Sequence, residues 1–262
     1  MQYCAVGRPQ RAANGTASDV SRPDATMEGV ADAVIFDFYG TLAHFVDARA
    51  SNYATVLTSF GYEVAPSVFD GYFTRYDGVD HAEHSVSEDA YEAWVRIRLR
   101  ELVSSCGVDD PDTEHVVEAL RELDQGEMVA YPEATAVLAS LREAGLAIGV
   151  CSNWGWELDG YLRQVGLLHL VDSGITSARV GSRKPHPGIY VRSVESLGID
   201  TARAVFVGDS WEPDVRGPRR LGMTAVHIWR DDERAGQLAP PLEPGDHRVN
   251  ELTGVLPIVG VS

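Results

Sequence analysis

Cysteine is scarce in this chain of 262 residues, which contains only Cys4, Cys106 and Cys151. The three are far apart in sequence and odd in number. A disulfide framework would need paired cysteines, and a zinc site would need closely spaced ones. The pattern argues against both and is typical of a protein of the reducing cytoplasm, which is the location that we predict.

Long apolar runs and excess positive charge are missing as well. No stretch of about 18 or more apolar residues appears, so we expect no membrane-spanning helix. The N-terminus lacks a basic region followed by an apolar one, so no secretory signal is expected. The 22 Lys and Arg residues are outnumbered by 39 Asp and Glu, which gives a formal net charge of −17. Because such a chain repels nucleic acid and anionic membranes, we expect neither as a partner, and the sequence leaves the oligomeric state open.

The composition divides the chain into three parts. Residues 1–29 are rich in Ala, Gly, Ser, Asp and Arg without an apolar period, which predicts a disordered lead-in and makes Met27 a candidate for the true start. Residues 45–128 show helical patterns and no strand pattern, so we predict an inserted helical domain there, with helices at 48–60, 67–76, 87–106 and 113–123. Residues 30–44 and 129–262 are predicted to form the core domain.

Within the core domain, short apolar runs alternate with helical patterns. Strands are predicted at 33–36, 146–151, 171–176, 204–207 and 224–229. The helices between them include one at 187–197, with Pro at its start and Gly after its end, and one at 213–221. This alternation indicates an α/β fold with a parallel sheet covered on both faces. Residues after about 231 are rich in Pro, Gly and charge and are predicted to form a loosely packed tail.

Polar residues follow several of the predicted strands directly. Asp37 ends the first strand, Ser152 and Asn153 end the second, and the loop after the third contains Lys184. The fourth strand ends at Gly208, followed by the group Asp209, Ser210 and Asp214. Because ligands of open parallel sheets bind outside the carboxyl ends of the strands, we expect these side chains to meet in one crevice.

The residue types suggest a chemistry for that crevice. A carboxylate such as Asp37 can act as a nucleophile and form a covalent intermediate. Carboxylates from two strands, Asp37 and Asp209 with Asp214 behind, form an oxygen cage suited to Mg²⁺. Lys184 would keep Asp37 ionised and screen the charge of a phosphate.

Each of these residues has an ordinary interpretation when taken alone. An Asp after a strand commonly caps a helix or a turn, a Lys before Pro is commonly solvated, and a Ser-Asn pair commonly caps a helix. Their occurrence in order, at the same end of successive predicted strands, favours a shared site. Other polar and aromatic residues receive the ordinary interpretation: His44 as a hinge residue, His81 and His84 as part of a solvated loop. Trp154 and Trp156 fit cleft lining and buried packing equally well.

Four segments together resemble the haloacid dehalogenase-like hydrolase superfamily over about residues 31–230. They are Asp37-Phe38-Tyr39-Gly40-Thr41-Leu42, Val150-Cys151-Ser152-Asn153-Trp154, Lys184-Pro185-His186-Pro187 and Val207-Gly208-Asp209-Ser210 with Asp214. The resemblance implies a Rossmann-like core of parallel strands. It also implies that the helical insert at 45–128 is a cap that closes over the site and selects the substrate.

The resemblance also implies residue roles. Asp37 matches the nucleophile, Ser152 the phosphate-binding hydroxyl and Lys184 the stabilising cation. Asp209 and Asp214 match the metal-binding acids of a Mg²⁺ site, to which Tyr39 would add its backbone carbonyl. We further assign Tyr39, Thr41, Asn153 and Ser210 to substrate binding. The expected activity is a Mg²⁺-dependent phosphatase acting on a small phosphorylated metabolite.

One position departs from the phosphatase pattern. Family phosphatases carry a second Asp two residues after the nucleophile as a general acid, and this chain has Tyr39 there. Dehalogenases of the family often have Tyr at that position, Asn after the Ser of the second motif, as Asn153, and a Tyr after the Lys, where Tyr190 could match. They need no metal, however, and usually lack the acid at Asp209. A 2-haloacid dehalogenase and a catalytically impaired ligand- or partner-binding protein therefore remain the alternatives.

Overall fold

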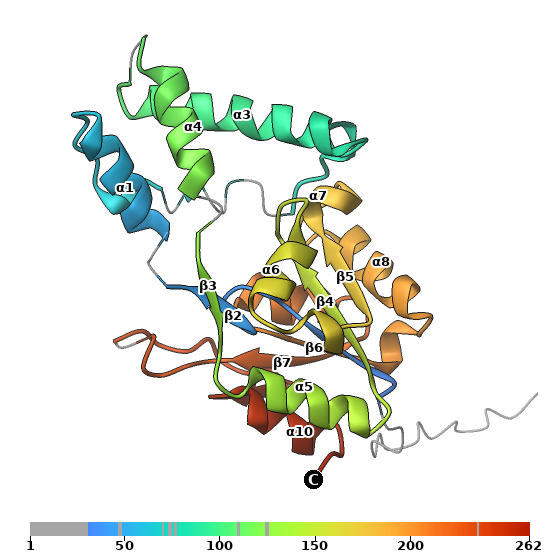
Figure 1. Ribbon diagram of the computed structural model, residues 1–262. Helices are drawn as coiled ribbons and strands as arrows, with labels where there is room; N and C mark the ends of the chain where they lie inside the picture. Colours follow the sequence, from blue (N-terminus) through green and yellow to red (C-terminus); the bar gives the residue numbers. More distant parts are fainter. Residues whose placement is uncertain are drawn as a thin grey trace, which may run out of the picture.

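The computed structural model describes residues 31–46, 49–69, 71–72, 75, 78–108, 111–123, 126–234 and 236–262. The lead-in predicted at 1–29 lies outside these residues. Figure 1 shows two layers of organisation: a sheet flanked by helices, and a separate group of helices above the carboxyl ends of its strands. No helix in the described part of the chain is long and apolar enough to cross a membrane.

A six-stranded parallel sheet forms the core, which confirms the predicted α/β fold. Its strands are β1 (Ala33–Phe36), β4 (Ala147–Ser152), β5 (Ser173–Thr176), β6 (Ala204–Gly208), β7 (Thr224–Ile228) and β8 (His247–Val249). They lie in the order β5-β4-β1-β6-β7-β8, and each neighbouring pair is parallel. From β1 the chain goes first to one side of the sheet and then to the other, so the strand order reverses between β1 and β6. This reversal point is where open α/β sheets bind ligands.

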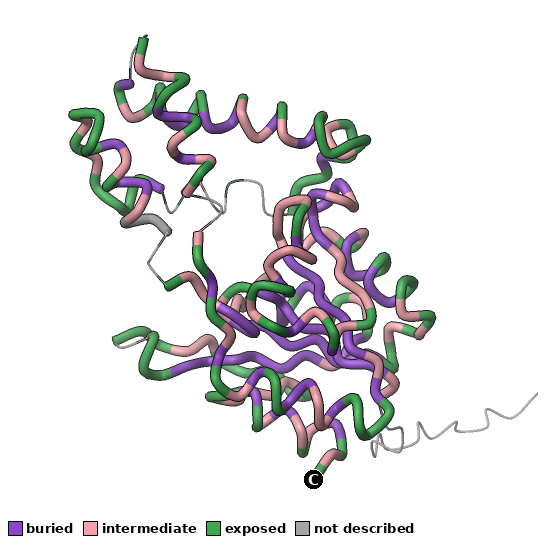
Figure 2. The backbone as a smooth tube through the Cα atoms, viewed as in Figure 1, coloured by how far each residue is buried: buried purple, intermediate pink, exposed green. Residues whose placement is uncertain are grey.

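Both faces of the sheet are covered, because alternate residues of each strand point to opposite sides. On β1, Val34 and Phe36 pack with the helices on one face, whereas Ile35 packs with those on the other. The first face is covered by α5 (Ala134–Glu143), α6 (Leu158–Gln164) and α10 (Val255–Ile258), and the second by α8 (Pro187–Leu197). Figure 2 shows the strands buried between these helices. Short helices α7 (Ser177–Val180) and α9 (Gly217–Arg219) complete the core.

The end of the chain is not the loose tail that its composition predicts. Strand β8 pairs with β7, and Leu252, Val255 and Val259 are buried in the main core cluster. These three residues follow a helical spacing, but the Pro- and Gly-rich stretch before them conceals it. The helix predicted at 213–221 also differs: Trp211–Arg216 forms a π-helix, which we label η5, before α9 begins.

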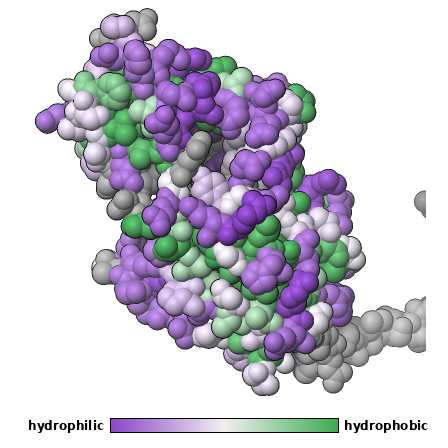
Figure 3. All heavy atoms as spheres, viewed as in Figure 1, coloured by the Kyte–Doolittle hydropathy of each residue, from purple (hydrophilic) through white to green (hydrophobic). Residues whose placement is uncertain are grey.

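The insert is helical, as predicted, and its helices are α1 (Arg49–Ser59), α3 (Glu88–Ser105) and α4 (Thr113–Leu123). Ser87 caps α3 by accepting a hydrogen bond from the backbone N–H of Ala90 at 3.2 Å. The helix predicted at 67–76 lies partly outside the described residues, and its first part forms a 3₁₀ turn at Pro66–Val68. Figure 3 shows mainly hydrophilic side chains over α3 on this face. The exact domain boundaries stay a prediction.

Two sets of backbone hydrogen bonds among the described residues join the cap to the core. The first is an antiparallel pair of short strands, β2 (Ala43–Phe45) and β3 (Met128–Ala130). In the second, backbone N–H groups and carbonyls of the cap loop at 78–82 pair with the core loop at 181–184. Gly78 donates to the carbonyl of Lys184 at 3.1 Å, and Arg183 donates to that of Val79 at 3.1 Å. The loop that carries Lys184 is therefore fastened to the cap.

The cap has an apolar cluster separate from that of the core, which predicts local stability. Leu99 is fully buried in the cap cluster, so we expect Leu99→Ala to lower the stability of the cap by about 2–5 kcal/mol. Amide hydrogen exchange should accelerate in α1, α3 and α4 while the strands of the core keep their protection. Ile97→Ala, at an exposed position of the same helix, is the control and should change little. Equal acceleration in core and cap would contradict the separation.

Candidate active site

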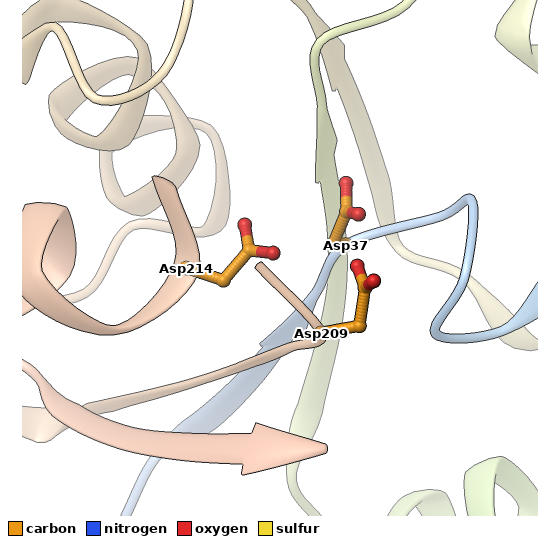
Figure 4. A group of neighbouring side chains, drawn as sticks. All are labelled: Asp37, Asp209 and Asp214. Carbon is orange, nitrogen blue, oxygen red and sulfur yellow. The ribbon is translucent and has the colours of Figure 1, made fainter. Parts of the chain in front are cut away.

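Three carboxylates meet at the carboxyl ends of β1 and β6. Asp37 follows β1, Asp209 follows β6, and Asp214 comes from η5. One oxygen from each lies within 4.8 Å of the others, and Figure 4 shows Asp214 facing Asp37 and Asp209, which extend in the same direction. The adjacency of Asp37 and Asp209 follows from the sheet, because Phe36 pairs with Val207 and both acids come shortly after these two parallel partners.

Lys184 is placed between two of these acids. Its Nζ lies 2.8 Å from Oδ1 of Asp37 and 2.6 Å from Oδ1 of Asp214. Burial lowers the pKa of Lys184, but Asp214 and Asp37 raise it by more, so the pKa stays well above its ordinary value. Lys184 is also the only lysine of the chain, and the other 21 of its 22 Lys and Arg residues are arginines. A compact ammonium fits this narrow space, whereas a guanidinium is wider and planar.

The backbone of Lys184 is held by Asn153. The side-chain amide of Asn153 donates to the carbonyl of Lys184 at 3.0 Å, and its oxygen accepts from the N–H of Lys184 at 2.6 Å. Asn153 follows β4, so this pair of bonds ties the lysine loop to the central sheet. In this structure the amide positions Lys184, while the predicted contact of Asn153 with substrate stays a prediction.

The acids of the fourth motif require glycine beside them. A Cβ at Gly208 would lie 2.4 Å from Cγ of Asp214, and one at Gly40 would lie 2.9 Å from Cγ of Asp209. Gly40 also has φ +80°, a conformation that other residues rarely adopt. The backbone N–H of Ser210 donates to Oδ2 of Asp214 at 2.9 Å. These close approaches bring the carboxylates within reach of one ion.

Burial changes the proton affinity of these acids. It raises the pKa of Asp209 to about 6, helped by the negative charge of Asp37 and opposed by Arg234. Burial also raises the pKa of Asp214, against the opposing charge of Lys184. Both raised pKa values have the same cause: an ionised carboxylate that is buried beside other carboxylates needs positive charge nearby. The two Lys184 contacts supply part of it.

Arg234 was not predicted from the sequence as part of the site. Its Nη2 lies 2.6 Å from Oδ2 of Asp209 and 3.1 Å from the carbonyl oxygen of the same residue. His227 also contacts that carbonyl, with Nε2 at 3.0 Å. Arg234 belongs to no motif and lies in the segment predicted to be a loose tail, so no sequence signal identified it.

The other predicted residues take different positions. Ser152 is buried and lines the cavity together with Tyr39, which is 43% exposed, and Ser210. Thr41 is fully buried, and its side chain is not among the described residues that line the cavity. Its carbonyl instead accepts from Nη2 of Arg230 at 3.3 Å.

Two residues outside the motifs are also clarified. His81, predicted in a solvated loop, is buried and stacks on Trp94 with ring centroids 4.9 Å apart, so that prediction is wrong. Burial and the nearby charge of Arg183 lower the pKa of His81 to about 4. Tyr190 is fully buried in the core, and its hydroxyl donates to the carbonyl of Pro213 at 2.5 Å, which braces η5.

A cavity of about 1110 Å³ lies over the carboxylates. Aromatic and basic side chains from both domains surround it. They include Trp154 and Trp156 from the core and Tyr72, Tyr91 and Arg98 from the insert. The space is much larger than a phosphate group, so it has room for the rest of a small organic substrate.

The acidic cluster fits Mg²⁺ by the chemistry of its donors. Three carboxylates supply only hard oxygen ligands, which this ion prefers, and no thiol or imidazole nitrogen belongs to the group. Asp37, Asp209 and Asp214 would hold the ion. The predicted backbone contribution of Tyr39 stays a prediction.

Comparison with known proteins agrees with the fold. The family described as haloacid dehalogenase-like hydrolase matches residues 31–222, and this chain belongs to that family. It is 34% identical over 104 residues to a glyceraldehyde 3-phosphate phosphatase of Methanopyrus kandleri, covering 38% of this chain and 43% of that protein. It is 36% identical over 123 residues to a phosphoserine phosphatase of Thermus thermophilus, covering 45% and 48%. The chain thus spans less than half the length of either relative.

A solved structure shows the same architecture. The L-2-haloacid dehalogenase of Xanthobacter autotrophicus superposes with a TM-score of 0.63 at 23% identity, covering 88% of this chain and 100% of that one. At this identity the likeness establishes the fold alone. The class is therefore a hydrolase of this family, and the reaction has to be argued from the site.

The buried position of Lys184 predicts a large effect of its removal. Lys184→Met leaves Asp37 and Asp214 without their shared cation, so we expect a loss of about 3–5 kcal/mol in the free energy of unfolding at neutral pH. The loss should shrink as the pH falls, because buried carboxyls with raised folded-state pKa values then take up protons and lose their charge. Urea unfolding at about pH 5 and 7.5 measures both.

Lys184→Arg is the matched variant, because it keeps the charge but needs more space. We expect it to be destabilised as well, through crowding, without the pH dependence of Lys184→Met. A Lys184→Met protein as stable as the wild type at neutral pH would contradict the role of the lysine as counter-charge.

Proposed function

We propose that this protein is a Mg²⁺-dependent phosphatase that acts on a small phosphorylated molecule through an aspartyl-phosphate formed on Asp37. The observation that carries the proposal is the cluster of Asp37, Asp209 and Asp214 within 4.8 Å of one another. Displacement of a halide from carbon has no need for such a cage, whereas a phosphate dianion beside three carboxylates requires a divalent cation.

The reaction follows from the positions of the side chains. An oxygen of Asp37 attacks phosphorus, an O–P bond forms, and the bond from phosphorus to the leaving oxygen breaks with its electron pair. The leaving oxygen takes a proton from water or from another acid. Water then attacks phosphorus, the bond between phosphorus and Asp37 breaks, and inorganic phosphate departs while the carboxylate is restored.

Other residues prepare these steps. Lys184, 2.8 Å from Asp37, offsets its charge and fixes its direction. The hydroxyl of Ser152 lines the cavity and is available to donate to a phosphate oxygen. When bound, Mg²⁺ supplies positive charge against the carboxylates and the phosphate. The cap covers the cavity and would limit the access of water.

The relatives support the reaction class without defining the substrate. Two of them are phosphatases, but each match covers less than half of the relative. Neither substrate is transferred to this chain. The aromatic side chains of the cavity, such as Tyr91 and Trp156, favour a substrate with a flat or apolar part.

Two alternatives keep some support. Tyr39 and Asn153 resemble the dehalogenase pattern, and the fold is shared with a 2-haloacid dehalogenase. In that reaction Asp37 would attack carbon and release halide without metal. A catalytically impaired ligand- or partner-binding protein is the third candidate, since Tyr39 replaces the usual general acid.

One set of assays separates these candidates. The protein is incubated with p-nitrophenyl phosphate, acetyl phosphate and L-2-chloropropionate, each with Mg²⁺ and with EDTA. We expect phosphate release that EDTA abolishes and that Asp37→Asn removes. Asp200→Asn, at an exposed turn of the core, is the matched control and should keep full activity. Chloride release that EDTA does not affect would identify a dehalogenase. If no substrate gives any product, the ligand- or partner-binding protein is the remaining candidate.

Tyr39 predicts which phosphates are cleaved slowly. It is exposed at the cavity but is no strong acid at neutral pH, so leaving groups that need a proton should react poorly. We expect Tyr39→Asp to raise kcat for an alkyl phosphate such as glycerol phosphate by up to about 10²-fold. The gain should be small for p-nitrophenyl phosphate, whose leaving group needs little protonation. Tyr39→Phe is the control. Equal gains on both substrates would contradict a general-acid effect.

A further inference from the structure

The guanidinium of Arg234 contacts one of the two carboxylate oxygens of Asp209, which belongs to the acidic cluster. Its Nη2 lies 2.6 Å from Oδ2 of Asp209, a distance typical of a charge-assisted hydrogen bond. The guanidinium carbon lies 4.8 Å from the centre of the Trp229 ring, so the ring supports it from one side. Both side chains are largely shielded from water, with 26% of Arg234 and 20% of Asp209 exposed.

The turn that carries Arg234 is anchored at its start. The N–H of Arg234 donates to the carbonyl of Arg230 at 3.2 Å. Arg230 pairs with Glu133 at 2.8 Å and stacks over the ring of Tyr131 at 3.5 Å. The approach of Arg234 to Asp209 is thus built into the packing at the end of β7.

Charge explains why an arginine lies there. The three carboxylates carry up to three negative charges, and Lys184 pairs with Asp37 and Asp214. Arg234 pairs directly with the third acid, Asp209, and lowers its pKa more than Lys184 does. A divalent ion bound to the same carboxylate would repel the guanidinium, because both cations would then contact one small group.

We infer that Arg234 is a positioning residue that holds Asp209 and competes with Mg²⁺ for this carboxylate. Together with Lys184 and Arg234, the three carboxylates have a net charge of about −1, whereas exchange of Arg234 for Mg²⁺ brings it to about zero. Exchange is thus electrostatically favourable, but Mg²⁺ has to compete with the arginine. The inference rests on the proposed Mg²⁺ site and adds that Arg234 weakens the affinity of this site for Mg²⁺.

Metal binding itself provides the test. Mg²⁺ is titrated into metal-free protein by isothermal calorimetry for the wild type, Arg234→Gln and Arg234→Lys. We expect Arg234→Gln to bind Mg²⁺ about tenfold more tightly, because no ion pair has to be broken. Arg234→Lys keeps the charge and should stay close to the wild type. Arg220→Gln, which removes an exposed arginine paired with Glu212 at 2.5 Å, is the control for net charge and should bind as the wild type does.

A second readout uses the single lysine of the chain. Protein labelled with ¹⁵N-lysine gives one backbone and one side-chain signal, both from Lys184 at the site. The Mg²⁺ concentration at which these signals shift should fall in Arg234→Gln in proportion to the calorimetric constant. At the same Mg²⁺ concentration, the increase in Tm caused by the ion should also be larger in Arg234→Gln than in the wild type. A merely structural role of Arg234 would not tighten metal binding in either measurement.

The outcomes are distinct. Equal or weaker Mg²⁺ affinity in a folded Arg234→Gln, with binding intact in the wild type, would overturn the inference and leave the proposed phosphatase standing. Absence of Mg²⁺ binding in the wild type and all variants at millimolar concentration would overturn both. Tighter binding in Arg220→Gln as well would assign the effect to net charge, and the specific role of Arg234 would be wrong.

Discussion

Mutual repulsion of carboxylates is the constraint on which this site depends. Asp37, Asp209 and Asp214 lie within one coordination sphere of each other, where burial already opposes their ionisation. Two cations from distant parts of the chain hold the cluster together: Lys184 bridges two acids, and Arg234 pairs with the third. Neither cation neighbours the acids in sequence. Folding must therefore place both beside the acids, because three buried carboxylates without positive charge would repel one another and destabilise the fold.

The sheet supplies the rigidity that this arrangement requires. Asp37 and Asp209 follow adjacent strands where the strand order reverses, so backbone pairing brings these two acids together. Glycines 40 and 208 permit an approach that any side chain would block. The hydroxyl of Tyr190, a residue of α8, donates to the carbonyl of Pro213 and so braces η5, which carries Asp214. The packing of the α/β core thereby fixes the relative positions of the three carboxylates.

Local patterns were sufficient to predict much of this. The apolar runs that end in polar residues located the strands and the motif acids, because burial and site formation both leave local signals. Arg234 and the end of the chain escaped prediction for a physical reason. Their roles come from tertiary contacts of Trp229, Arg230 and Leu252, which lie around a Pro- and Gly-rich stretch. His81 escaped because a loop rich in His and acids resembles a solvated one until Trp94 covers it.

The loop that carries Lys184 is also connected to the cap. The cap loop at 78–82 shares backbone hydrogen bonds with residues 181–184, and Lys184 is the bridge between Asp37 and Asp214. A Cβ at Gly181 would lie 2.6 Å from the Cα of Ala82, so the two loops are in close contact. Movement of this part of the cap would therefore be transmitted to the ammonium group. The cap loop and the loop that carries Lys184 are thus joined by hydrogen bonds across the boundary between the two domains.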